Sequence, residues 1–270
     1  MDFKSKYPLT TREAVCTPLI LFDGFSKNND IPCPTLKGIR HFTNYCGVSY
    51  SALRTSLSRL HAEGYIRIFK DDRNITRYQM TESSMDIGKA MTDRLMRPEG
   101  FLLAIFSFTK DDVTERAIVR DTLRYYGFKK LAQNTYINGR IETGSLTKTM
   151  LELGLEKNLY LFHCPNVDDA GLIEKILAVF EIEKRNGLLH AFQKDLTTFL
   201  ADGNAGRQET IHRLYYCGPV HWKVCFLDEP PFPIRYLPDD YPLDAIIRFY
   251  TDRMNTHSKD LIDNYLEVNE

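Results

Sequence analysis

Apolar residues in the first third of the chain recur at helical spacing, in three segments separated by polar breaks. Side chains three and four positions apart share one face of a helix, so each segment predicts an amphipathic helix. The predicted helices run over residues 10–25, from about Thr35 to Gly47, and from Ser49 to about Glu63. Residues 26–30 predict a loop. We expect Thr11 and Ser49 to act as helix caps, because their hydroxyls can accept hydrogen bonds from free backbone N–H groups.

Two β-rich runs follow the third predicted helix and surround a polar tip. Residues 65–70 and 75–80 are rich in β-branched and aromatic side chains, and residues 71–74 supply the turn between them. This pattern predicts a β-hairpin. Helix, helix, short glycine-containing turn, helix and hairpin is the order of a winged helix-turn-helix. We therefore expect this DNA-binding fold in residues 1–97.

The middle of the chain alternates continuous apolar runs with amphipathic segments. Strands are predicted at residues 101–108, near 132–137 and at 158–164. Helices are predicted from Asp111-Asp112 to Gly127, near 145–153 and at 170–180. Alternating strands and helices in so small a unit predict a ferredoxin-like α/β domain over residues 98–180.

From residue 181 onward the pattern is helical, apart from a proline-rich connector at residues 229–233. Helices are predicted at residues 188–200, 208–225 and 243–254, with another towards the end of the chain. We expect residues 181–270 to form a helical effector or dimerisation domain. The predicted fold class is thus α+β, with a winged helix-turn-helix, a ferredoxin-like domain and a helical domain in that order.

Charge is divided unevenly along the chain. Residues 1–97 contain 15 Lys and Arg against 10 Asp and Glu, a net charge of +5, whereas residues 98–270 contain 20 against 26, a net charge of −6. Residues 31–62 contain no acidic residue. A basic N-terminal third on an acidic remainder favours contact with a polyanion at the basic end.

The cysteines and the apolar segments bear on the cellular compartment. Six cysteines are scattered without a CxxC pair, which fits a reducing environment. No run of residues approaches the roughly 18 apolar positions of a membrane span, and the N-terminal residues lead into no apolar signal core. We therefore expect a cytoplasmic protein with no membrane partner.

The outward side of the third predicted helix carries side chains suited to reading DNA. With its leucines turned inward, this helix presents Arg54 and several hydroxyl groups, and no carboxylate before Glu63. An α-helix fits the major groove, where one arginine can donate two hydrogen bonds to guanine. The hairpin adds cations suited to phosphates or the minor groove. The predicted DNA-binding residues are Lys37, Ser49, Tyr50, Ser51, Arg54, Thr55, Ser58, Arg59, Lys70, Arg73 and Arg77.

The segment 53–66, LRTSLSRLHAEGYI, resembles the recognition helix and wing entry of the PaaX family, regulators of phenylacetic-acid and related aromatic catabolism. Residues 106–137, 228–233 and 237–242 are similar to later regions of that family, in the same order. The resemblance implies a homodimeric repressor that binds a double-stranded DNA operator of an aromatic or acyl-CoA catabolic operon. It also implies release by a small-molecule inducer, an acyl-CoA such as phenylacetyl-CoA. Tyr65 and Tyr241 stand where family members often have tryptophan.

Catalytic motifs do not stand out in the sequence: it contains no GxSxG, P-loop, HExxH or glycine-rich dinucleotide turn. We therefore expect no enzyme and no cofactor. The densest group of metal-ligating residue types is His212, Cys217, His221 and Cys225. Because this group lacks a CxxC or HxxxH pair, core packing is the favoured interpretation and no metal is predicted.

Two alternatives of other classes stay open. Asp111 and Asp112 follow a predicted strand and suit a metal-dependent nuclease or other enzyme built on the middle domain, although capping of the next helix explains them better. A small-molecule sensor that acts through protein partners is the second alternative. Apart from these alternatives, Arg213, Tyr215 and Trp222 are predicted as the wall of a ligand pocket, for which helix packing is the competing interpretation.

Overall fold

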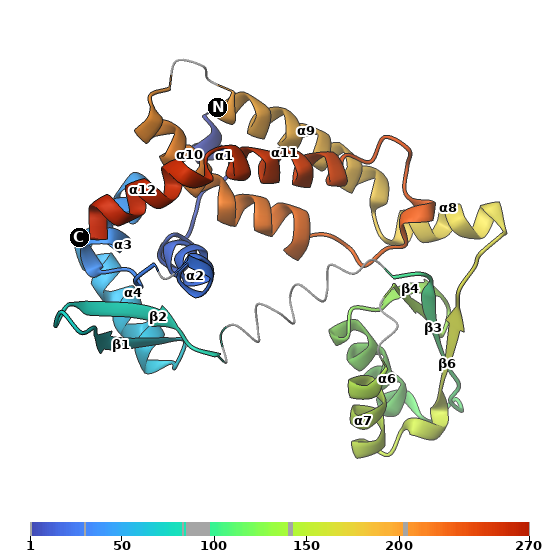
Figure 1. Ribbon diagram of the computed structural model, residues 1–270. Coiled ribbons are helices and arrows are strands. Elements are labelled where there is room, and N and C mark those ends of the chain that lie inside the picture. The colour runs from blue at the N-terminus through green and yellow to red at the C-terminus, as the bar shows by residue number, and fades with distance from the viewer. Residues whose placement is uncertain are drawn as a thin grey trace. The chain divides into compact units, whose positions relative to one another are not determined.

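The computed structural model describes residues 2–29, 31–82, 84, 98–139, 143–201 and 205–269. Its contacts divide the chain into two compact units, the first made of residues 1–93, 190–228 and 242–270 and the second of residues 94–189 and 229–241. The fold is mixed α/β, with two small antiparallel sheets and a helical C-terminal part (Figure 1). The segment predicted as a separate helical domain, residues 181–270, is shared between these units.

The first unit begins with helices and one hairpin, as the sequence predicts. Its N-terminal elements are α1 (Phe3–Lys6), α2 (Thr11–Asn29), α3 (Leu36–Tyr45), α4 (Tyr50–Ala62), β1 (Ile66–Lys70) and β2 (Thr76–Met80). The two strands are antiparallel, with Ile66 opposite Met80. Val15, Ile39 and Leu53, from three different helices, are fully buried in one apolar cluster, which also includes Ile66. The three predicted helices and the hairpin are therefore confirmed.

Helix α2 differs from the prediction at both ends. Thr10, not Thr11, caps it: Thr10 Oγ1 accepts a hydrogen bond from Glu13 N (3.2 Å), and Glu13 Oε2 accepts one from Thr10 N (2.7 Å). This reciprocal pair is a capping box. At the other end, residues 26–29 belong to the helix rather than to the predicted loop, and residue 30 lies outside the described residues. Local propensity is a weak guide to where a helix ends, because packing overrides it.

The C-terminal helices complete the core of the first unit. They are the later part of α9 (Ile182–Leu200), α10 (Arg207–Trp222) with a π-helical turn over Lys223–Leu227, α11 (Leu243–Thr256) and α12 (Ser258–Asn269). Helix α10 packs against α2 and α3, and α12 packs against α3. Phe42 of α3 is buried with Tyr215, Leu261 and Tyr265. The N-terminal helices thus share a continuous core with the end of the chain.

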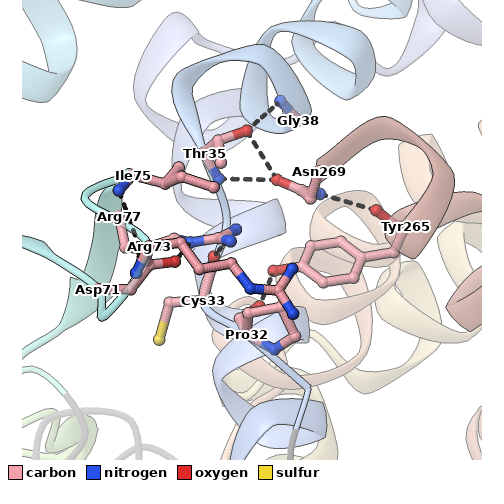
Figure 2. A network of polar contacts seen from close by, with 10 residues as sticks. All are labelled: Pro32, Cys33, Thr35, Gly38, Asp71, Arg73, Ile75, Arg77, Tyr265 and Asn269. Atoms are coloured by element: carbon pink, nitrogen blue, oxygen red, sulfur yellow. Dashed lines mark hydrogen bonds and ion pairs between the residues drawn. The ribbon is translucent and has the colours of Figure 1, made fainter.

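Hydrogen bonds from α12 fix the start of α3 (Figure 2). Asn269 Oδ1 accepts from Thr35 N (2.7 Å) and from Thr35 Oγ1 (2.9 Å), while Thr35 Oγ1 accepts from Gly38 N (3.1 Å). The hydroxyl of Tyr265 donates to the carbonyl oxygen of Pro32. A β-carbon at position 38 would collide with the Asn269 carboxamide and displace it from its hydrogen bonds with Thr35.

Within the described residues, the second unit contains a four-stranded antiparallel sheet, three helices of its own and the first part of α9. Its elements are β3 (Phe101–Phe106), α6 (Val113–Tyr125), β4 (Lys129–Ala132), β5 (Thr135–Asn138), α7 (Gly144–Glu152), a 3₁₀ turn at Glu156–Asn158, β6 (Leu159–Cys164), α8 (Ala170–Val179) and a 3₁₀ turn at Ile234–Tyr236. The strand order is β4-β5-β3-β6. The prediction of a single strand near residues 132–137 is wrong. Two short strands form a hairpin there, with Asn134 in the left-handed conformation (φ 57°) that asparagine tolerates.

Both faces of this sheet are used, because alternate side chains of a strand point to opposite sides. Leu102 and Ala104 of β3 pack with Val119 of α6 and Met150 of α7. Phe101, on the other face, packs with α8 and with the proline-rich connector. Within the described ranges, no helix is both long and apolar enough to cross a lipid bilayer.

Candidate nucleic-acid interface

Helix α4 has one apolar face and one exposed polar face. Ser49 caps it, its side chain accepting from Ala52 N (3.2 Å). Leu53, Leu57 and Leu60 are buried and hold the helix against α2 and α3. The exposed side chains of the opposite face are Ser51, Arg54, Thr55, Ser58 and Arg59. The structure therefore brings the central predicted residues together on one accessible surface, which we call the α4 outer face.

One end of the α4 outer face is a stack of two guanidinium groups on an aromatic ring. Tyr50 is 43% exposed, and its ring centroid lies 4.9 Å from Arg40 Cζ and 6.0 Å from Arg54 Cζ. Such contacts hold an arginine in place without neutralising its charge. Arg40 was not among the predicted residues. The available signal was its place in the acid-free stretch 31–62, ten positions before Tyr50.

The carboxylate at the C-terminal end of α4 is paired with an arginine. Glu63, at the end of α4, pairs with Arg12 of α2 at 3.1 Å. Between the start of α2 and α4 the surface is hollowed, and Thr10, Ser51 and Thr55 contribute hydroxyl groups to the lining. An anion that approaches α4 thus meets hydroxyl donors and cations with little opposing negative charge.

The hairpin tip presents two exposed cations. Lys70 Nζ donates to Asn74 Oδ1 (2.8 Å), and the side chain of Arg73 is exposed. The turn is held by Asp71, whose Oδ1 accepts from Arg73 N (3.0 Å) and Ile75 N (2.9 Å). Lys37 is also exposed, near the start of α3. These positions are accessible, as expected for contacts with phosphate.

Arg77 does not belong to this surface, which corrects its predicted role. It is 4% exposed; Nε donates to Asp71 Oδ2 (2.8 Å) and Nη1 donates to the Cys33 carbonyl oxygen (3.0 Å) (Figure 2). The hydrogen bond from Arg77 is the main cause that lowers the pKa of the Asp71 carboxyl. Arg77 thereby ties the hairpin to the loop that precedes α3. The same loop also bonds β2 through its backbone, since the carbonyl oxygen of Pro34 accepts a hydrogen bond from Tyr78 N (3.0 Å).

The three residues proposed to line a ligand pocket take separate partners. Tyr215 is 1% exposed, its ring centroid lies 4.7 Å from that of Phe42, and its hydroxyl donates to the Ala14 carbonyl oxygen (2.9 Å). Arg213 donates to Glu209 Oε1 (2.9 Å), and Trp222 packs against Phe226. Each contact serves the packing of α10, which was the competing interpretation.

The histidine and cysteine group of the sequence is dispersed over α10. Cys217 and Cys225 are buried thiols, and the buried ring of His221 stacks on Tyr250 at 4.4 Å. Burial lowers the pKa of His221 to about 4, so it is neutral at pH 7. His212 lies elsewhere and contacts His41 of α3. In the part of the chain that the structure describes, no three His, Cys, Asp or Glu residues converge on a point suited to a metal.

Asp112 occupies the N-cap position of α6, but its side chain accepts hydrogen bonds from the preceding Thr109 rather than from the backbone of the helix. Asp112 Oδ2 accepts from Thr109 N (2.9 Å) and Thr109 Oγ1 (2.7 Å), and these bonds lower the pKa of the carboxyl. The carboxylate therefore stabilises the turn before α6, and it lies at the positive end of the helix dipole.

Comparisons with known proteins bear on the fold. A scan against protein-family models finds no match, and a search of curated proteins finds none either. Among solved structures, the chain is similar to the uncharacterized protein Rv0674 from Mycobacterium tuberculosis, with a TM-score of 0.60 and 14% sequence identity, over 95% of this chain and 99% of that one. At this identity the likeness extends to the fold alone.

Proposed function

We propose that the protein is a sequence-specific DNA-binding transcription regulator whose first unit contains a winged helix-turn-helix. The element order α2, α3, α4, β1, β2 supports this proposal, since it is the order of that motif. The observation that carries it is the α4 outer face: an exposed arginine and hydroxyl surface, on a helix whose other side is anchored by buried leucines.

In this proposal α4 enters the major groove. Arg54 reads guanine, while Ser51, Thr55 and Ser58 bond bases or phosphates at close range. Arg40 and Arg59 lie beside them, and Lys70 and Arg73 at the hairpin tip contact the flanking backbone. The acid-free stretch 31–62 keeps repulsion from the duplex low.

The second unit, by its element order, supports a ferredoxin-like domain and offers a surface for a second copy of the chain. Strand β6 lies at the edge of the sheet, and Ile105, Tyr160 and Phe162 are 37%, 52% and 50% exposed. Ile105 lies opposite Tyr160 in the ladder, so their side chains share one face. Packing of this exposed face against the same face of a second copy would cover these groups and give the two-fold symmetry of a homodimer. A Phe162→Glu variant that stays dimeric by light scattering would contradict this contact.

The resemblance to the PaaX family refines the proposal to a cytoplasmic repressor of an aromatic or acyl-CoA catabolic operon, released by an acyl-CoA inducer. The test is fluorescence anisotropy of the untagged full chain with DNA from upstream of its own gene, titrated at several salt concentrations. We expect binding that weakens steeply with salt and exceeds binding to a shuffled duplex. Equal affinity for both duplexes would refute sequence-specific recognition.

A parallel titration tests the inducer. Phenylacetyl-CoA should release the labelled upstream DNA, with free coenzyme A as the matched control. Release by both compounds alike would indicate competition by a polyanion rather than induction. If neither phenylacetyl-CoA nor another aromatic acyl-CoA released the DNA, the acyl-CoA inducer would be refuted, whereas the proposal of DNA binding would be unaffected.

A further inference from the structure

Three side chains from two helices of the first unit converge at their polar ends. His41 Nε2 of α3 lies 3.2 Å from His212 Nε2 of α10. Gln208 Nε2, one turn before His212, lies 2.9 Å from His41 Nε2 and 3.1 Å from His212 Nε2. The three atoms form a nearly equilateral triangle at a half-exposed position.

No placement of hydrogens on neutral histidines satisfies all three contacts. The Nε2 atom of a neutral imidazole either donates or accepts, and it cannot do both. If both Nε2 atoms accept, their lone pairs face each other. If one donates to the other, Gln208 would have to accept from the donor and donate to the acceptor with a single atom, which neither end of a carboxamide can do. The triangle is therefore frustrated as a hydrogen-bond network.

A metal ion removes this conflict, because all three groups then present lone pairs to a common centre. Ligand atoms about 2.0–2.1 Å from a metal are separated from one another by about 3 Å in tetrahedral or octahedral geometry. The two ends of the Gln208 amide are interchangeable by a half-turn of the side chain, which places Oε1 in the triangle. We propose that His41 Nε2, His212 Nε2 and Gln208 Oε1 bind one divalent first-row transition-metal ion, with water at the remaining positions.

The surroundings suit this assignment. Burial lowers the pKa of both histidines, so each imidazole is neutral and able to ligate near pH 7. The ring of Tyr45 stacks on His212 at 4.7 Å and fixes its orientation. Asn264, 4% exposed, donates from Nδ2 to Gln208 Oε1 at 2.9 Å. The half-turn of Gln208 is therefore accompanied by a half-turn of the Asn264 carboxamide. The Asn264 Oδ1 atom, which is buried without a partner among the described residues, then accepts from Gln208 Nε2, as outer-shell partners of metal ligands do.

The charged groups beside the site have opposite effects on the binding of a cation. The carboxylate of Glu209 opposes the burial-driven lowering of the His212 pKa and attracts a cation, whereas Lys4, 3.3 Å from the Tyr45 ring centroid, repels one. Two imidazoles and one neutral oxygen favour zinc, nickel, cobalt or copper over magnesium or calcium. Occupancy would tie α3 to α10 directly, in addition to the apolar packing between them.

The test is isothermal titration of the untagged full chain with Zn²⁺, together with Co²⁺ absorption as a report on the ligand sphere. We expect one ion per chain, and an affinity lowered at least tenfold by His41→Gln and by His212→Gln. Removal of outer-shell partners typically costs about 10–100-fold, so Asn264→Ser should also weaken binding. His163→Gln, an exposed histidine of the second unit, is the matched control and should leave the titration unchanged.

Stability gives an independent readout. Because metal binds the folded state, Zn²⁺ should raise the Tm of the native chain and not of His41→Gln. Gln208→Ala, a substitution at an exposed position, should weaken binding while preserving the circular dichroism spectrum. Absence of stoichiometric binding, or binding unaffected by the two histidine variants, would overturn the proposal. Neither result bears on DNA binding, which rests on α4.

Discussion

Arg54 and Arg77 lie 23 positions apart in the same basic region, but one is exposed and the other is buried. Arg54, on the α4 outer face, is exposed and lies over the ring of Tyr50. Arg77 is buried and divides its donors between Asp71 and the Cys33 carbonyl oxygen. The first is available to a ligand, whereas the second is part of the fold. Charge in a sequence therefore indicates a potential interface only where the tertiary structure leaves that charge exposed.

The largest expected effect concerns a buried group that is neutral in the fold. His221 has its pKa lowered to about 4 by burial, so between pH 6.5 and 4 the unfolded chain binds more protons than the folded chain. Stability should therefore fall as pH drops through that window, by about 3 kcal/mol in total from this residue. Urea unfolding at a series of pH values measures it. His221→Phe should flatten the profile, and His163→Gln should not; an unchanged profile in the first variant would contradict the burial effect.

Next comes Arg77→Ala, which should lower the free energy of unfolding by about 2–3 kcal/mol. The variant loses a hydrogen bond from a buried charged group and the packing of a long side chain. Denaturant unfolding measures the loss. If binding to upstream DNA is assayed well below the unfolding midpoint, base preference should stay as in the native chain. If the fully folded Arg77→Ala variant had an altered base preference, Arg77 would have to be assigned to the DNA interface after all.

Arg54→Ala should do the reverse. Stability should change little, while discrimination at one base pair should fall by about 1–3 kcal/mol, as expected for a lost bidentate contact. Anisotropy against a panel of single-base variants of the operator measures it. Arg124→Ala, an exposed arginine of α6, is the matched control. A preference profile identical in both variants would refute the role of Arg54.

The smallest effects are expected at the hairpin tip. Lys70→Ala and Arg73→Ala should each weaken binding to every sequence alike and reduce the slope of log affinity against log salt by about 1. The base preference should persist, because phosphate contacts carry no sequence information. A salt slope that neither substitution changes would show that the tip does not contact DNA.

Much of the local structure was predictable, because hydrophobic spacing and caps act over short distances. Ser49, the leucines of α4 and the hairpin around residues 71–74 all lie where the pattern predicts them. The errors have local causes as well: Asn134 adopts the left-handed conformation at the turn that divides one expected strand into two, and the capping box makes Thr10, rather than Thr11, the cap of α2. Neither depends on distant parts of the chain.

What the sequence by itself determined is which faces of the helices are apolar and where the acid-free, basic stretch lies, since periodicity and charge are properties of neighbouring residues. Only the tertiary structure decided which cations stay exposed and which distant groups meet. It buried Arg77 beneath the loop that precedes α3, and it brought His41 to His212 across 171 positions of the chain. Contacts of this kind depend on how α10 and α12 pack against α3. That packing joins residues far apart in the sequence, so no pattern among neighbouring residues predicts it.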